Sequence, residues 1–265
     1  MSNPTLSEAD IESLAEVVDT AALQTAPIPM LTAATPALDL DTAYDVQRAS
    51  IERRLTRGEE LVGMKMGLTS RAKMEQMGVH NPIYGHLTSS MLLDDGDAIS
   101  HSEHCHPRVE PEIAFILGED LQGPTTAAHA MMHVSGICSA LEVIDSRYEN
   151  FKFTLIDVVA DNASSSHFVL GNTVRSVEDL DISNLGMVMQ VNGKPVQVGS
   201  SAAIYEHPAR SLAALANMVA ERGEYLPAGF IVLAGGATAA VALQPGDNVT
   251  LKAEGLGTCS LTVKD

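Results

Sequence analysis

The sequence predicts an α+β protein with a mixed, rolled β-sheet and a helical N-terminal segment. Three observations support this class: the candidate strands are short, their connections are rich in turn-forming residues, and strands do not alternate regularly with helices. Regular alternation would favour a doubly wound parallel sheet instead. We expect a helical subdomain over residues 1–60 and a β-roll domain over residues 61–265, folding as one cooperative unit.

The first sixty residues have the pattern of helices. Ser7 is a suitable N-cap for a helix whose apolar residues between Ile11 and Val18 follow helical spacing. Three prolines between residues 27 and 36 then predict an irregular connection. A second helix is expected to begin near Thr42 and to end at Gly58.

The rest of the chain contains short apolar runs that are typical of strands. The runs that we interpret as strands are Leu61–Leu68, Glu112–Leu117, Ala140–Ile144, Phe230–Leu233, Val249–Ala253 and Thr258–Val263. Residues 186–199 hold two alternating runs joined by Asn192 and Gly193, a dipeptide that favours a tight hairpin turn. Helices are expected near residues 126–134 and 211–222.

The charge of the chain excludes several kinds of partner. Its 34 acidic and 16 basic residues give a formal net charge of −18, which repels nucleic acids and anionic membranes. No apolar run approaches the roughly 18 residues of a membrane helix, and the N-terminus lacks a secretory pattern. Three widely spaced cysteines indicate a reduced, cytoplasmic protein. An anionic substrate would need local positive charge, which a bound divalent cation would supply.

Three glutamates form the most informative pattern. Glu110 and Glu112 stand two residues apart, so on a strand they project from the same face. Pro111 between them lacks an N–H group and suggests a sheet edge or a bulge. Glu142 interrupts an apolar run, where an unpaired carboxylate would be costly. These ligands suit Mg²⁺ or Mn²⁺; alternatively, the glutamates lie solvated on an exposed strand face.

Lys65 is the second candidate residue. It is the only charged residue in the apolar run LVGMKMGL, so it is either a desolvated ammonium that stabilises a developing oxyanion or a solvated lysine on an edge strand.

Two polar segments are further candidates. In residues 157–166, Asp161, Asn162 and Ser164 either form turn hydrogen bonds or offer polar groups to a ligand. Residues 234–238, which include Gly236 and Thr238, follow a strand, and their backbone amides can hold a carboxylate.

Six segments occur in an order that resembles one family. They are GMKMGLTS at Gly63, NPIYGHL at Asn81, EPEIAFIL at Glu110, EVIDSRYENFKF at Glu142, VADNASS at Val159 and GGATAAV at Gly235. Together they resemble the hydratase/decarboxylase family of aromatic meta-cleavage pathways, within the fumarylacetoacetate hydrolase superfamily. The resemblance covers essentially the whole chain. It implies a mixed β-roll or barrel fold with peripheral helices.

The resemblance also implies a site. A divalent ion, usually Mg²⁺ and alternatively Mn²⁺, would be held by Glu110, Glu112 and Glu142, with Lys65 as the catalytic lysine. The side chains of Leu68, Ile83 and Tyr84 are expected to form the walls of the substrate pocket. The residues expected to orient the substrate are Asp161, Asn162, Ser164, Gly236 and Thr238.

The activity implied by the resemblance is decarboxylation of 2-oxo-3-hexenedioate to 2-hydroxypenta-2,4-dienoate and carbon dioxide. The alternatives are hydration of 2-hydroxypenta-2,4-dienoate, hydrolysis of an acylpyruvate, and a non-catalytic role as a partner subunit. Hydratases of this family tend to carry an acidic residue at the position of Ile83, which favours the decarboxylase. The resemblance further implies a homo-oligomer that associates with the hydratase of the same pathway.

Overall fold

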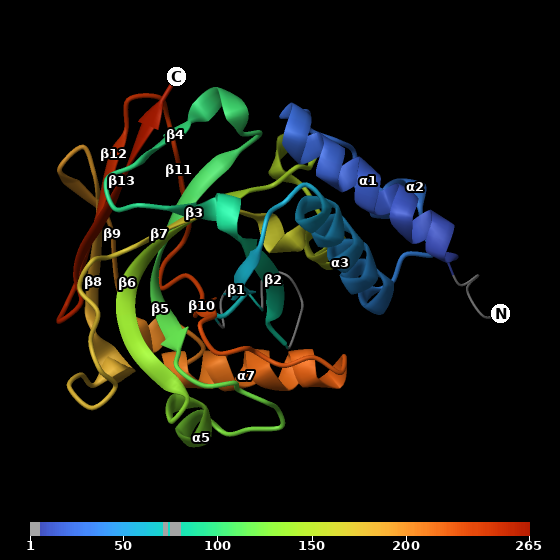
Figure 1. The fold of residues 1–265 in the computed structure, drawn as a ribbon. Helices are drawn as coiled ribbons and strands as arrows, with labels where there is room; N and C mark the ends of the chain where they lie inside the picture. The colour runs from blue at the N-terminus through green and yellow to red at the C-terminus, as the bar shows by residue number, and fades with distance from the viewer. Residues whose placement is uncertain (1–5, 71–73, 75–80) are drawn as a thin grey trace.

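The protein is built around one curled sheet. The structure is a computed structural model, and it describes residues 6–70, 74 and 81–265. It contains an eight-stranded sheet, a five-stranded sheet beside it, and helices that lie beside the larger sheet (Figure 1). This arrangement confirms the predicted α+β class with a rolled, mixed sheet.

The N-terminal helices form a layer beside the larger sheet. They are α1 Glu8–Gln24, α2 Leu31–Ala34 and α3 Leu40–Thr56 (Figure 1). A capping box between Ser7 and Asp10 begins α1, as predicted. Asp39 caps α3, so this helix begins slightly earlier than expected. An ion pair between the buried Asp19 and Arg57 joins α1 to the end of α3.

The larger sheet has the strand order β2-β1-β10-β5-β6-β7-β3, and β11 also pairs with β5. Its strands are β1 Leu61–Gly67, β2 Ile83–Thr88, β3 Leu92–Leu93, β5 Pro107–Leu117, β6 Val134–Asp145, β7 Ser165–Leu170, β10 Ile231–Leu233 and β11 Val241–Ala242. The pairs β1–β10 and β3–β7 are parallel, whereas the other pairs are antiparallel. The sheet curls until β2 contacts β7, which gives the half-barrel seen in Figure 1.

The smaller sheet packs against β6 of the larger one. Its strands, in spatial order, are β4 Ala98–Ser100, β13 Gly257–Lys264, β12 Asn248–Ala253, β8 Gly186–Val191 and β9 Lys194–Ser200. Asn192 and Gly193 make the predicted turn between β8 and β9, with φ angles of 53° and 76°.

Further helices in the described ranges are α5 Ala127–Met131, α6 Leu155–Ala160 and α7 Pro208–Glu221, and they include both helices expected after residue 61. Short 3-10 helices occupy Ser89–Met91, His101–Glu103, Glu149–Phe151, Asn162–Ser164, Ile182–Asn184 and Ser201–Ala203. No helix in the described ranges is both long and apolar enough to cross a membrane. The division into a subdomain and a β-roll that fold together stays a prediction.

One expectation about Pro111 is wrong. The residue does not lie on an edge strand, because β5 pairs with β6 on one side and with β10 and β11 on the other. The carbonyl of Pro111 accepts a hydrogen bond from Ala237, in the segment between β10 and β11. Since the N and O atoms of a strand residue point to the same side, its missing N–H faces this gap in the ladder.

Candidate functional site

Three glutamates converge on one face of β5 and β6. Glu110 and Glu112 are two residues apart on β5, and Glu142 is the direct cross-strand neighbour of Glu110. Strand alternation therefore places all three side chains on the same face. One carboxylate oxygen from each lies within 4.8 Å of the other two. Their exposed fractions of 7%, 0% and 1% exclude the solvated strand face considered above. We call these three residues the glutamate triad.

Burial makes the negative charge of the triad unfavourable in the protein alone. It raises the pKa of Glu112 well above its usual range, and the neighbouring carboxylate of Glu142 raises it further. Burial also raises the pKa of Glu142, against the opposing effect of the Lys65 ammonium. A site of this kind favours a cation that neutralises the carboxylates together.

Lys65 supplies a buried positive charge beside the triad. It pairs with Leu233 on β10, which pairs with Ala114 on β5, so its side chain shares the face of Glu112. Its Nζ lies 3.0 Å from Oε1 of Glu142 and donates a hydrogen bond of 3.1 Å to the carbonyl of Ala163. Because β1 lies between β2 and β10 and Lys65 is 3% exposed, it is not a solvated edge-strand lysine.

The triad fits a hard divalent cation. Oε1 of Glu112 and Oε2 of Glu142 are buried and have no hydrogen-bond partner within the described part of the chain. The other oxygen of Glu112 accepts the N–H of Gly235 at 2.7 Å, which fixes the orientation of this carboxylate. Buried carboxylate oxygens without protein donors are suitable ligands for Mg²⁺ or Mn²⁺.

The polar segment at residues 161–164 packs over β2, but two of its side chains are already engaged. Both carboxylate oxygens of Asp161 accept hydrogen bonds from Arg147. The amide of Asn162 bonds to the backbone N–H and carbonyl of His86, at 2.7 and 2.9 Å. The polar atoms of these two side chains therefore hold the protein together, and a contact of either side chain with the substrate stays a prediction.

Hydroxyl groups near the triad are better placed to bind a ligand. Ser164 Oγ is buried without a hydrogen-bond partner among the residues that are described. The same is true of Thr69, which lies in the segment GMKMGLTS but was not among the predicted site residues. A Cβ atom at Gly235 would lie 2.2 Å from Oγ1 of Thr69, so this hydroxyl packs directly on the glycine that binds Glu112. The position of Thr69 directly after the predicted strand of Lys65 was the feature of the sequence that could have indicated this residue.

The other selected residues of the glycine-rich segment are placed differently. Gly236 is buried one residue beyond Gly235. The hydroxyl of Thr238 donates to the carbonyl of Ala239, and its methyl group packs against Gly199 of β9. The structure therefore keeps Gly236 close to the contact between Gly235 and Glu112, whereas Thr238 faces the smaller sheet.

The three expected pocket walls do not share one face. A Cβ atom at Gly67 would lie 3.0 Å from Cγ1 of Ile83 and 3.8 Å from Nζ of Lys65, so Ile83 borders the lysine. Tyr84, the next residue, points to the opposite face of β2 and stacks on Tyr44 of α3 at 4.5 Å. Tyr84 therefore does not lie on the face of β2 that carries Ile83, and its role as a wall of the substrate pocket stays a prediction. Leu68 has a φ of 56° and packs partly buried against the main core.

Tyr84 lines a surface cavity of about 720 Å³. Ile83 also borders this cavity, together with residues of α3 and α7.

The buried His86 should make the stability of the folded protein sensitive to acid. Its Nδ1 lies 3.0 Å from Oε1 of Gln47, and burial lowers its pKa to about 4. The unfolded chain would bind this proton near pH 6.5. The contribution is therefore complete above pH 6.5 and is lost as the pH falls towards 4. Replacing His86→Gln should reduce the pH slope of the unfolding free energy by about 1.4 kcal/mol per pH unit in this window.

Urea denaturation at fixed pH values between 6.5 and 4.5 measures this slope. An equal slope in the variant and the original protein would contradict the assignment. Replacing the exposed His129 in the same way serves as the control for the loss of a histidine.

The sequence of the chain matches a known protein family and several enzymes. Residues 61–264 match the model of the family described as fumarylacetoacetate (FAA) hydrolase C-terminal. A 4-oxalocrotonate decarboxylase from Pseudomonas sp. (strain CF600) is 46% identical over 99% of both chains. A 2-hydroxyhexa-2,4-dienoate hydratase from Comamonas testosteroni is 36% identical over 85% of this chain and 87% of its own.

One solved structure is closely similar. It is the 4-oxalocrotonate decarboxylase from Pseudomonas putida G7 complexed with magnesium and adipate, with a TM-score of 0.96 and 44% identity. The match covers 98% of this chain and all of that one.

Proposed function

The chain belongs to the fumarylacetoacetate hydrolase C-terminal family, and on this premise we propose that it catalyses the metal-dependent decarboxylation of 2-oxo-3-hexenedioate (4-oxalocrotonate). The products are 2-hydroxypenta-2,4-dienoate and carbon dioxide, as in the breakdown of aromatic compounds by meta-cleavage. The observation that carries this proposal is the end-to-end similarity to decarboxylases, which exceeds the similarity to hydratases. The enzyme is thus a carboxy-lyase.

The glutamate triad is proposed to hold the metal, with Mg²⁺ as the first choice and Mn²⁺ as the second. The solved relative that contains magnesium and the unpartnered oxygens of the triad both support this assignment. A divalent ion at this position would supply Lewis-acid stabilisation for negative charge on a 2-keto acid.

The residues around the triad have separate proposed roles in the reaction. The C6 carboxylate of the substrate is vinylogously β to its C2 ketone, so loss of carbon dioxide moves electrons toward the C2 oxygen. Lys65 donates a hydrogen bond to that oxygen as its negative charge develops. Ile83 provides an apolar surface that favours loss of the departing carboxylate's charge. The hydroxyls of Ser164 and Thr69 and the backbone at Gly236 orient the substrate.

The residue at position 83 also distinguishes decarboxylation from the alternative reaction, hydration. Adding water to the dienol product requires a group that handles a proton and water. The apolar isoleucine beside Lys65 can neither transfer a proton nor hydrogen-bond a water molecule. The observed position of Ile83 therefore favours decarboxylation over the hydratase alternative.

A direct assay tests the proposed function. With Mg²⁺, the purified chain should release carbon dioxide from 2-oxo-3-hexenedioate, and removal of the metal with a chelator should abolish the release. Added Mg²⁺ should restore it. Water addition to 2-hydroxypenta-2,4-dienoate without carbon dioxide release from the first substrate would instead identify a hydratase.

We further propose that the chain self-associates and works beside the pathway hydratase in the cytoplasm. Strand β9 is the edge of the smaller sheet, and its Val196 and Val198 are 41% and 72% exposed, as expected of a surface that pairs with another chain. The three cysteines are unpaired, in agreement with a reducing compartment. Light scattering with and without the hydratase tests both associations.

A further inference from the structure

The segment over β2 contains an unusual backbone conformation. Asn162, Ala163 and Ser164 have successive φ angles of 50°, 49° and 59°. Residues other than glycine seldom adopt this left-handed conformation, which costs about 1–2 kcal/mol per residue. Three in a row persist only when the surrounding structure holds them. We call residues 162–164 the left-handed turn.

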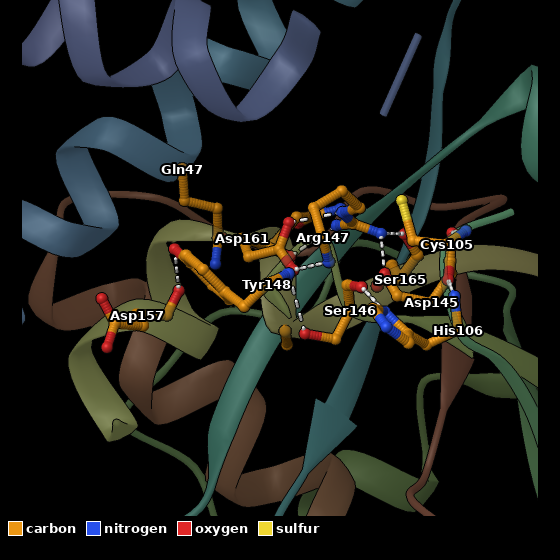
Figure 2. Close-up of polar contacts among 12 residues, drawn as sticks. Gln47, Cys105, His106, Asp145, Ser146, Arg147, Tyr148, Asp157, Asp161 and Ser165 are labelled. Atoms are coloured by element: carbon orange, nitrogen blue, oxygen red, sulfur yellow. Dashed lines mark hydrogen bonds and ion pairs between the residues drawn. The ribbon is translucent and has the colours of Figure 1, made fainter. Parts of the chain in front are cut away.

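Arg147 holds both ends of this turn. Its Nε donates to Oδ1 of Asp161, and its Nη2 donates to the Asp161 carbonyl at 2.7 Å. Its Nη1 donates to the carbonyl of Ser165 at 2.9 Å. Figure 2 shows the guanidinium of Arg147 lying between these two residues. One buried side chain therefore fixes the residue before the turn and the residue after it.

The arginine is itself fixed to the strand that carries Glu142. Nη1 of Arg147 also donates to the carbonyl of Asp145, the last residue of β6. The carboxylate of Asp145 in turn accepts the backbone N–H groups of Cys105 and His106, ahead of β5 (Figure 2). Hydrogen bonds thus connect the turn to β6 and to the residues just before β5, the two strands that carry the glutamate triad.

Besides the hydroxyl of Ser164, the turn presents a backbone carbonyl to the site. Its central carbonyl, that of Ala163, accepts the hydrogen bond from Nζ of Lys65 at 3.1 Å. The same ammonium lies 3.0 Å from Oε1 of Glu142. The carbonyl of Ala163 therefore gives the ammonium of Lys65 an anchor that is separate from the triad.

We propose that Arg147 is a positioning residue for Lys65, acting through Asp161 and the left-handed turn. The proposal rests on the function proposed above for Lys65. Arg147 contacts neither the triad nor the lysine in the described structure. Its loss should misplace the ammonium while leaving the metal ligands on β5 and β6 in position. A displacement of about 1 Å at a reacting group can lower the rate a hundredfold.

The test compares Arg147→Met with a matched control. The control is Asp19→Asn, which breaks an ion pair between α1 and Arg57 at the end of α3; the side-chain hydrogen bonds of Asp19 come from Arg53 and Arg57 rather than from the turn. In Arg147→Met, kcat should fall about 10- to 100-fold, while the Mg²⁺ concentration for half-maximal thermal stabilisation changes by less than about threefold. Asp19→Asn should lose stability and keep its kcat.

Two further measurements separate positioning from stability. Hydrogen exchange of the amides of residues 162–166 should accelerate in Arg147→Met and stay unchanged in Asp19→Asn. In a Lys65→Met background, adding Arg147→Met should lower kcat by less than about threefold, because the residue that it positions is already absent. If Arg147→Met does not fold, the same criteria apply to Asp161→Asn. This variant removes the negative charge that pairs with Arg147.

The possible failures are distinguishable. A wild-type enzyme without decarboxylase activity overturns the proposed function, whatever the exchange rates show. An active wild type overturns only the role of Arg147 if kcat survives in its variant, if the Mg²⁺ midpoint shifts together with kcat, or if the Lys65 and Arg147 effects multiply.

Discussion

Replacing Glu112→Gln is expected to abolish Mg²⁺ binding and to lower kcat by about 10³-fold or more, because Lewis-acid stabilisation amounts to several kcal/mol. The amide keeps an oxygen that can accept the N–H of Gly235, but it places an NH₂ group where the unpartnered carboxylate oxygen lies. An amide is a poor substitute for a charged oxygen ligand of a hard cation.

The stability of the metal-free protein should change in the opposite direction. Burial and the carboxylate of Glu142 both disfavour a charged Glu112, so a neutral glutamine should leave the metal-free protein as stable as before or more so. The gain in stability on adding Mg²⁺ at a hundred times its Kd, about 2.7 kcal/mol for the original protein, should be absent. Thermal unfolding with and without Mg²⁺ measures both effects.

A matched control uses another glutamate. Glu119 has a side chain that is 78% exposed, and Glu119→Gln should keep both the activity and the response to Mg²⁺. A Glu112→Gln protein that is still stabilised by Mg²⁺ would contradict the assignment of the triad.

The sequence is sufficient to predict the parts of the site that depend on one strand. The i, i+2 spacing of Glu110 and Glu112 predicts a shared face, and the structure has this arrangement. The apolar surroundings of Glu142 indicate a buried carboxylate, which is also observed. These inferences hold because strand alternation is local and a buried charge needs compensation.

The rest depends on pairing between distant segments. Tyr84 and Ile83 are neighbours in sequence, and only the register of β2 against β1 decides which of them borders Lys65. The polar atoms of Asp161 and Asn162 have the composition of a binding loop. Their partners, Arg147 and His86, are 14 and 76 residues away along the chain, and nothing local in the sequence points to them.

Replacing Lys65→Met should separate metal binding from catalysis. The methionine is apolar and similar in length, so it fits the buried site but cannot donate a hydrogen bond to a developing oxyanion. Loss of one such donor lowers kcat by about 10²- to 10³-fold. Mg²⁺ should bind several-fold more tightly, about 1 kcal/mol, because the ammonium 3.0 Å from Glu142 no longer opposes the cation.

Titration calorimetry with Mg²⁺ and the carbon dioxide assay at saturating metal measure these two effects. The exposed Lys194 on β9 provides the matched control, since Lys194→Met removes the same charge far from the triad in sequence and should alter neither quantity. Tighter metal binding together with a large loss of kcat can arise only if the lysine acts on the substrate. Weaker Mg²⁺ binding in Lys65→Met would mean that the residue supports the metal site, and the catalytic role would then be withdrawn.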